Sequence, residues 1–160
     1  MERLLAGFGV PPSFIDQITR RLREDGRLPN AGRGTVAADI GPREATLILL
    51  AIAGSEFASR SRSALAQLAI FEIVGDVAPR LSRSFIASVE ALLSSADAAA
   101  TVREIRVARG NGRSSILYDD EYIEHFALVD SPGVPALSTQ GIIWGGLISE
   151  LETGLRGSRI

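Results

Sequence analysis

The 160-residue chain contains no cysteine and no lysine, and it has a single histidine. Without cysteine it forms no disulfide and no zinc finger, and Cys-His catalysis and thiol redox chemistry are excluded. Without lysine it lacks the amine of a Walker-type phosphate loop, a Schiff-base nucleophile or a Ser-Lys dyad. These absences leave a narrow range of catalytic chemistry.

The sequence also lacks a long hydrophobic run. The longest, residues 45–54, is about ten residues, whereas a membrane span needs ~20. No hydrophobic core of a signal peptide follows Glu2 and Arg3, and the absence of cysteine is compatible with a reducing compartment. We therefore expect a soluble, cytoplasmic protein with no membrane partner.

Hydrophobic residues make up 46% of the chain, which is enough to bury a core. The charge is unevenly distributed around a net value of −2, because residues 1–62 carry nine arginines against seven acids and residues 63–160 carry eight against twelve. The basic excess is sharpest in residues 17–34, where five arginines meet only Glu24 and Asp25. This is a local basic patch, and an ordinary solvated helix face is its simplest alternative explanation.

Helices are predicted in the first part of the chain. Residues 2–7 form a short helix that stops at two glycines, and a turn with two prolines follows. Ser13 is the expected N-cap of a second helix, residues 13–25, in which Phe14, Ile15, Ile18 and Leu22 share one face. An arginine-bearing loop, residues 27–34, comes next.

Helices give way to strands in the second part. Pro42 opens a buried helix over residues 43–53, Ser55 caps a longer one to about residue 74, and a third spans 82–95. Strands are expected at 102–107, 114–118 and 122–129, followed by a final helix at 139–151. The predicted fold is α+β and mostly α: an N-terminal helix-turn-helix with supporting helices, a small antiparallel β-meander and a C-terminal helix. Residues 1–55 would be the head and 56–160 the oligomerisation core.

A short helix, a tight turn and a second helix with a basic outer face have the layout of a helix-turn-helix. Glutamine and arginine can form bidentate hydrogen bonds with adenine and guanine in the major groove. We expect Ser13, Gln17 and Arg20 to read bases, because they lie towards the N-terminal end of the second helix. The residues expected to hold phosphates are Arg21, Arg23, Arg27 and Arg33.

The segment GVPPSFIDQITRRLREDGRLP, followed by GRG, resembles helix-turn-helix segments of bacterial and bacteriophage DNA-binding proteins. The matching positions are Val10, Ile18, Leu22, Arg23, Gly26, Leu28 and Pro29. The resemblance covers residues 1–55 and implies binding to double-stranded DNA. It implies two roles equally, a transcriptional regulator or a small-terminase-like subunit that recognises phage DNA for packaging. A third helix of such a domain would come from downstream.

The C-terminal helix suggests assembly. Trp144, Leu147, Ile148 and Leu151 would form one stripe with Ile143, and Gly141 and Gly145 would allow close backbone approach. Packing against the chain's own sheet is the simpler explanation, and an oligomer interface is the alternative. A homo-oligomer also follows from DNA binding, because paired helix-turn-helix units read two half-sites.

An enzyme is the less favoured interpretation. Residues 119–125 gather four carboxylates and the only histidine, which invites a magnesium site. Strand alternation, however, would place Glu124 and His125 on opposite faces, and aspartates are common in turns. We expect no catalysis, no metal and no cofactor. The remaining alternative is an oligomeric adaptor whose arginine-rich helix binds an acidic protein partner.

Overall fold

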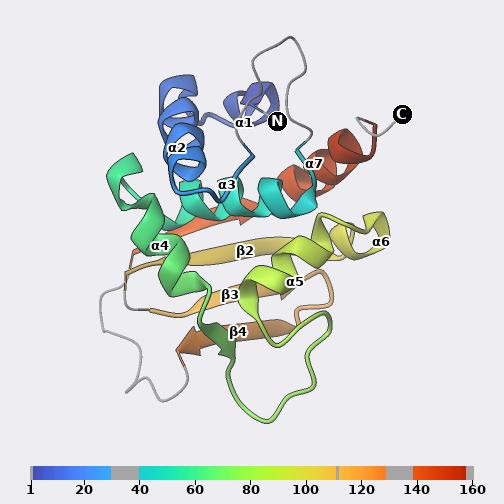
Figure 1. The fold of residues 1–160 in the computed structure, drawn as a ribbon. Coiled ribbons are helices and arrows are strands. Elements are labelled where there is room, and N and C mark those ends of the chain that lie inside the picture. Colours follow the sequence, from blue (N-terminus) through green and yellow to red (C-terminus); the bar gives the residue numbers. More distant parts are fainter. Residues whose placement is uncertain (1, 30–39, 111, 129–138, 158–160) are drawn as a thin grey trace.

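A five-stranded antiparallel sheet covered by helices forms the body of the molecule (Figure 1). The computed structural model describes residues 2–29, 40–110, 112–128 and 139–157. The helices of this part are α1 (Glu2–Gly7), α2 (Pro12–Glu24), α3 (Pro42–Gly54), α4 (Ser61–Leu68), α5 (Phe85–Leu92), α6 (Ala96–Ala99) and α7 (Gly145–Gly157). A 3-10 turn, η1 (Ala58–Arg60), precedes α4. The predicted α+β class is confirmed.

The strands are β1 (Phe71–Ile73), β2 (Val102–Arg109), β3 (Ser114–Tyr118), β4 (Ile123–Leu128) and β5 (Thr139–Trp144). They lie in the order β1-β4-β3-β2-β5, with every neighbouring pair antiparallel. The meander predicted from the sequence is β2-β3-β4, and its three strands are confirmed to within about two residues at each end. β1 and β5 extend it on either side.

Helix α3 connects the N-terminal helices to the sheet. Pro42 begins it, and the Gly41 amide donates to Oε2 of Glu44 at 3.0 Å, which satisfies one of the free amides at the helix start. Every residue from Ala45 to Ala51 is buried. Figure 1 shows α3 alongside the β2–β5 part of the sheet, with α1 and α2 on its far side, and α3 packs against α2 as well as against β2 and β5. It is the supporting helix that the sequence predicted from downstream.

One continuous hydrophobic core runs from Leu5 in α1 to Leu155 in α7. Within it, Phe85 of α5 meets Phe126 of β4 with ring centroids 5.2 Å apart, so α5 is fixed on the sheet. No helix in the described part of the chain has the length and apolar character needed to cross a membrane.

The long helix expected between residues 55 and 74 is wrong. Ser55 ends α3 instead, η1 and α4 follow, and α4 stops at Leu68. The chain then becomes β1, in which buried Phe71 and Ile73 flank exposed Glu72 and pair with β4. A three-residue strand is too short for its alternation to stand out beside an apolar helical pattern. The helix expected at 82–95 is likewise shorter, because α5 begins only after Ser84.

The final helix expected at residues 139–151 is half wrong. Residues 139–144 form β5, and α7 begins at Gly145. Both glycines do permit close approach, because a Cβ on Gly141 would lie 2.1 Å from the Ala53 carbonyl oxygen and one on Gly145 would lie 1.7 Å from that of Val102. Close approach at the two glycines is therefore confirmed, but Gly141 lies in a strand and not on the predicted helix face.

Candidate nucleic-acid interface

Helix α2 has one buried and one exposed face. Ile15, Ile18 and Leu22 are almost fully buried, and the Thr19 hydroxyl donates to the Asp16 carbonyl at 3.0 Å on the same helix. The opposite side is exposed at Ser13, Asp16, Gln17, Arg20, Arg21 and Glu24. Because Ser13, Gln17, Arg20 and Glu24 follow one another at helical spacing, they form a line along this face. The three residues predicted to read bases therefore lie together.

The turn before α2 fixes the angle at which the helix leaves α1. Amides of Phe8 and Val10 both donate to the Leu5 carbonyl, at 3.1 and 3.2 Å, and Gly9 has a φ of +83°, which a glycine adopts without strain. Leu5 itself is fully buried. Helix α2 then begins at Pro12, so the prediction that Ser13 is its N-cap is wrong. Pro11 holds that position, and Pro12 follows at the first helical position, where proline is favoured because its missing amide needs no partner.

The C-terminal end of α2 is also fixed by backbone hydrogen bonds. Amides of Arg27 and Leu28 both donate to the Leu22 carbonyl, at 2.9 and 3.2 Å, while Gly26 takes a φ of +68°. Leu28 is buried, and Arg23 and Arg27 are half-buried beside it. Two of the predicted phosphate-binding arginines thus extend from a rigid helix end. Arg33, the fourth, lies outside the residues that the structure describes.

Arg20 is only loosely paired. Its Nε lies 3.5 Å from Oε1 of Glu24, one turn along, and both side chains are largely exposed. Pairs with this geometry contribute at most about 0.5 kcal/mol, because solvent screens them and two long side chains must be held. Arg20 could therefore exchange Glu24 for a base edge or phosphate at little cost.

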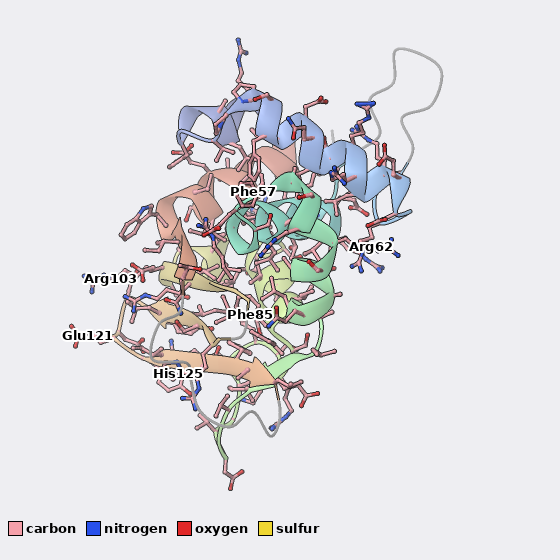
Figure 2. The ribbon with its side chains drawn as sticks, turned by 90° about the vertical axis from the view of Figure 1, so that its left-hand side faces the viewer. Phe57, Arg62, Phe85, Arg103, Glu121 and His125 are labelled. Atoms are coloured by element: carbon pink, nitrogen blue, oxygen red, sulfur yellow. The ribbon has the colours of Figure 1, made fainter. Side chains whose placement is uncertain are left out.

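The basic surface extends further than residues 17–34. Helix α2 packs against η1 and α4, and Nη1 of Arg62, in α4, lies 3.5 Å from Oδ1 of Asp25. Figure 2 shows Arg62 next to the C-terminal part of α2. Arg60 of η1 is exposed one position from α4. The sequence does not reveal that these two arginines lie near α2, because its pattern predicts one long helix from residue 55 to about residue 74 that contains both.

A polar cavity of about 160 Å³ adjoins this surface at Arg60. Its lining also includes Arg109, whose Nε donates to the Ala53 carbonyl at 2.9 Å, and the carboxylate of Glu56. Two arginines against one carboxylate give the lining a net positive charge, which suits an anionic group.

The carboxylates of residues 119–125 do not come together as a metal site. Glu124 is buried and His125 is exposed, as strand alternation predicted, and Figure 2 shows His125 on the outside of the sheet. Burial and the charges of Arg113 and Arg106 lower the pKa of His125. Asp120 lies in the β3–β4 turn, where Glu121 has a φ of +63°. Among the described residues, no group of three or more histidine, aspartate or glutamate side chains could hold a metal ion.

Two of these carboxylates, those of Asp120 and Glu124, belong to a polar network within the chain. Buried Glu124 accepts from the Tyr118 hydroxyl at 2.7 Å and from the Arg80 amide at 2.6 Å. The Arg80 guanidinium lies 4.5 Å from the ring centroids of Tyr118 and Tyr122 and pairs with Asp120 at 2.5 Å. Burial, together with the hydrogen bond to Glu124, raises the pKa of Tyr118 far above its usual value. Each group already has a partner within the chain.

The predicted assembly stripe is divided between two environments. Leu147, Ile148 and Leu151 are buried against the chain's own sheet and helices, whereas the Trp144 side chain is 58% exposed. The three aliphatic residues are therefore not available to a partner. Trp144 is available to a partner, because it ends β5 rather than lying within α7.

Comparison with protein-family models, curated proteins and solved structures returned no significant match. The helix-turn-helix resemblance stays a prediction, and the geometry of α2 is the remaining guide to function.

Proposed function

We propose that this chain is a non-catalytic, cytoplasmic protein that binds double-stranded DNA through α1 and α2, with α2 in the major groove. The supporting observation is the exposed line of Ser13, Gln17 and Arg20 on a helix whose other face is buried. A helix with exposed donors at one-turn spacing suits direct readout, because its backbone fixes the points from which these side chains enter the groove.

In this proposal the residues divide by role. Gln17 and Arg20 contact base edges, and Ser13, in the first turn, contacts a base or the adjoining phosphate. Arg21, Arg23, Arg27 and Arg33 hold the backbone, and Arg60 and Arg62 add phosphate contacts beyond the end of α2. Affinity would then depend mainly on arginine and specificity on the exposed line.

Two biological roles fit this proposal equally, a transcriptional regulator and a phage DNA-packaging subunit. A head that recognises DNA serves both, and the difference lies in the partner. A packaging subunit would bind a large ATPase-nuclease, whereas a regulator would act at a promoter. Co-expression with the products of neighbouring genes, followed by co-purification, separates them.

One observation favours a second candidate function. The exposed face of α2 also carries Asp16 and Glu24, which would repel phosphates. Such a mixed-charge face suits an oligomeric adaptor that binds a protein with complementary charges. Under this alternative, loss of Arg20 weakens a protein complex and leaves any residual DNA affinity unchanged.

The test is fluorescence anisotropy with random duplex DNA from about 50 to 200 mM salt. If the six arginines assigned to phosphates each neutralise one, the log-log slope is about −5 per protomer. The double variant Arg20→Ala/Arg21→Ala should lose most of the binding. Its matched control, Arg83→Ala/Arg103→Ala, removes the same charge from exposed positions away from α2 and should retain it; Figure 2 shows Arg103 on the sheet. Absence of binding at the lowest salt would reject DNA binding and favour the adaptor.

A further inference from the structure

The two edge strands of the sheet, β1 and β5, differ in what lies on their outer side. Beyond β1, an isolated bridge joins Glu72 to Ser84, and the Ile73 amide donates to the Arg83 carbonyl at 2.9 Å. At the opposite edge, β5 has β2 as its only strand partner within the described part of the chain. Within the described residues, one edge is thus covered by the chain itself, and the other presents a row of backbone groups.

Strand β5 itself carries neither charge nor proline to discourage pairing. Natural edge strands are commonly interrupted by charged residues, prolines or bulges, but β5 reads TQGIIW and has no charge. Besides Gln140, its outward side chains are Ile142, 51% exposed, and Trp144, 58% exposed. Both are large and apolar, and tryptophan is enriched at the centres of protein interfaces.

Strand β5 packs closely against α3 on the helix-covered side of the sheet. Gly141 and Ile143 are buried on the helix-covered side, and Gly141 lies so close to the Ala53 carbonyl that no side chain fits between them. Gln140, Ile142 and Trp144 consequently share the opposite side, because successive strand residues alternate. These contacts hold the β5 backbone in an extended conformation to which another strand can pair.

Charge along the neighbouring strand favours a neutral partner such as a second copy of this chain. Glu104 lies opposite Trp144 and Arg106 opposite Ile142 in the β2–β5 register. These two charges pair with each other through Arg106 Nε and Glu104 Oε1, so they present little net charge. A second β5, itself uncharged, would meet no like charge at this edge.

We propose that two copies of the chain associate by antiparallel pairing of β5 with β5, around a two-fold axis at Ile142. Directly opposite residues in a continuous sheet must share a face, so the axis passes through a residue and not between two. An axis at Gly141 would leave Trp144 without an opposite residue. An axis at Ile142 pairs residues 140–144, places Ile142 against its own copy and sets Trp144 opposite Gln140 and diagonal to Ile142.

This pairing stands on the edge strand and does not depend on DNA binding. It would supply the two copies that a helix-turn-helix dimer needs to read two half-sites. The contact is small beside the ~800 Å² per partner of a typical stable interface. We therefore expect a dimer of micromolar affinity, strengthened when both copies bind one DNA molecule.

Single cysteines test the register, because the chain has none of its own. Opposite residues of paired strands have Cα atoms about 4.5–5.5 Å apart, within the range of a disulfide. Under mild oxidation without DNA, Ile142→Cys should run as a covalent dimer on a non-reducing gel. Gln140→Cys and Trp144→Cys should each stay largely monomeric alone and cross-link when mixed.

The control is Ile123→Cys, which is 44% exposed on β4. In the proposed dimer its copies lie seven strand spacings apart, ~33 Å, so it should not cross-link.

In sedimentation of the intact chain, Trp144→Arg should weaken dimerisation at least tenfold, and Ile123→Arg should not, with circular dichroism confirming that both fold. Equal cross-linking of Ile123→Cys and Ile142→Cys, or a monomer at every concentration, would overturn the proposal. Cross-linking without any DNA binding would keep the dimer and reject only the proposed function.

Discussion

The two polar regions of the molecule, the exposed face of α2 and the network around Glu124, differ in how completely their groups are satisfied. In the network, the buried carboxylate, the two tyrosines and Arg80 all have partners within the chain. On α2, Gln17 and Arg21 project into solvent, and Arg20 has only the long, exposed contact with Glu24. Charged residues alone would have identified both regions as candidate sites.

The difference shows what distinguishes a structural cluster from a candidate binding surface. A buried group that loses its partner is costly, so the hydrogen bonds of Glu124 to the Tyr118 hydroxyl and the Arg80 amide serve the fold rather than a ligand. An exposed pair is weak, so the groups on α2 can change partners. Mutations should therefore affect stability in the first region and binding in the second.

The largest expected effect is on stability, at Glu124. Replacing Glu124 with alanine leaves the Tyr118 hydroxyl and the Arg80 amide without their acceptor, which should lower the free energy of unfolding by about 3 kcal/mol. Urea unfolding measures it, with Glu150→Ala, an exposed position on α7, as the control that should change little. If Glu124→Ala is as stable as wild type, the Glu124 network does not stabilise the fold, and the proposed difference between the two regions is wrong.

The next effect is on binding, at Arg20. Arg20→Ala should weaken binding to a cognate duplex by roughly 1–3 kcal/mol and relax base preference at one position. Unfolding of the variant should match wild type, because its contact with Glu24 is weak. Competition anisotropy against a panel of single-base variants of the site measures this. If Arg103→Ala has an equal effect, bulk charge alone explains the affinity and the base-reading role is wrong.

A smaller effect is expected where the basic surface passes onto α4. Arg62→Ala should weaken binding to all sequences alike and reduce the salt slope by about one unit, as expected for the loss of one phosphate contact. It also frees Asp25, which adds a small repulsion. An unchanged slope would confine the DNA surface to α2 and exclude η1 and α4 from it.

The sequence predicted the elements with strong periodicity. The second helix and the meander strands show clear periods of 3.6 and 2, and each occurs close to its predicted range. The exposed arginines of α2 could be predicted for the same reason, because once the apolar stripe is assigned, Arg20 and Arg21 must lie away from it.

The features that could not be predicted depend on contacts between distant segments. β5 was assigned to a helix because Ile143 and Trp144 fit the stripe of Leu147 and Ile148. Only pairing with β2 makes those residues a strand. Arg62 joins the α2 surface through Asp25, 37 positions away in the chain, which no local pattern encodes.

The smallest effect concerns pH, at the exposed rim of the Glu124 network. Arg80 holds the pKa of Asp120 below its ordinary value of 3.8, chiefly through their hydrogen bond. A carboxyl group with a lowered folded-state pKa contributes stability above its ordinary pKa, and this contribution disappears as pH falls through the lowered value. Wild type should thus be slightly more stable than Asp120→Asn at neutral pH, and the difference should vanish as the pH falls through the lowered pKa of Asp120. Urea unfolding of both proteins from pH 7 downward measures it. A difference that persists at the acid end would mean that Asp120 does not act through its charge, because both asparagine and a protonated aspartate keep an oxygen that can accept from the Tyr122 amide.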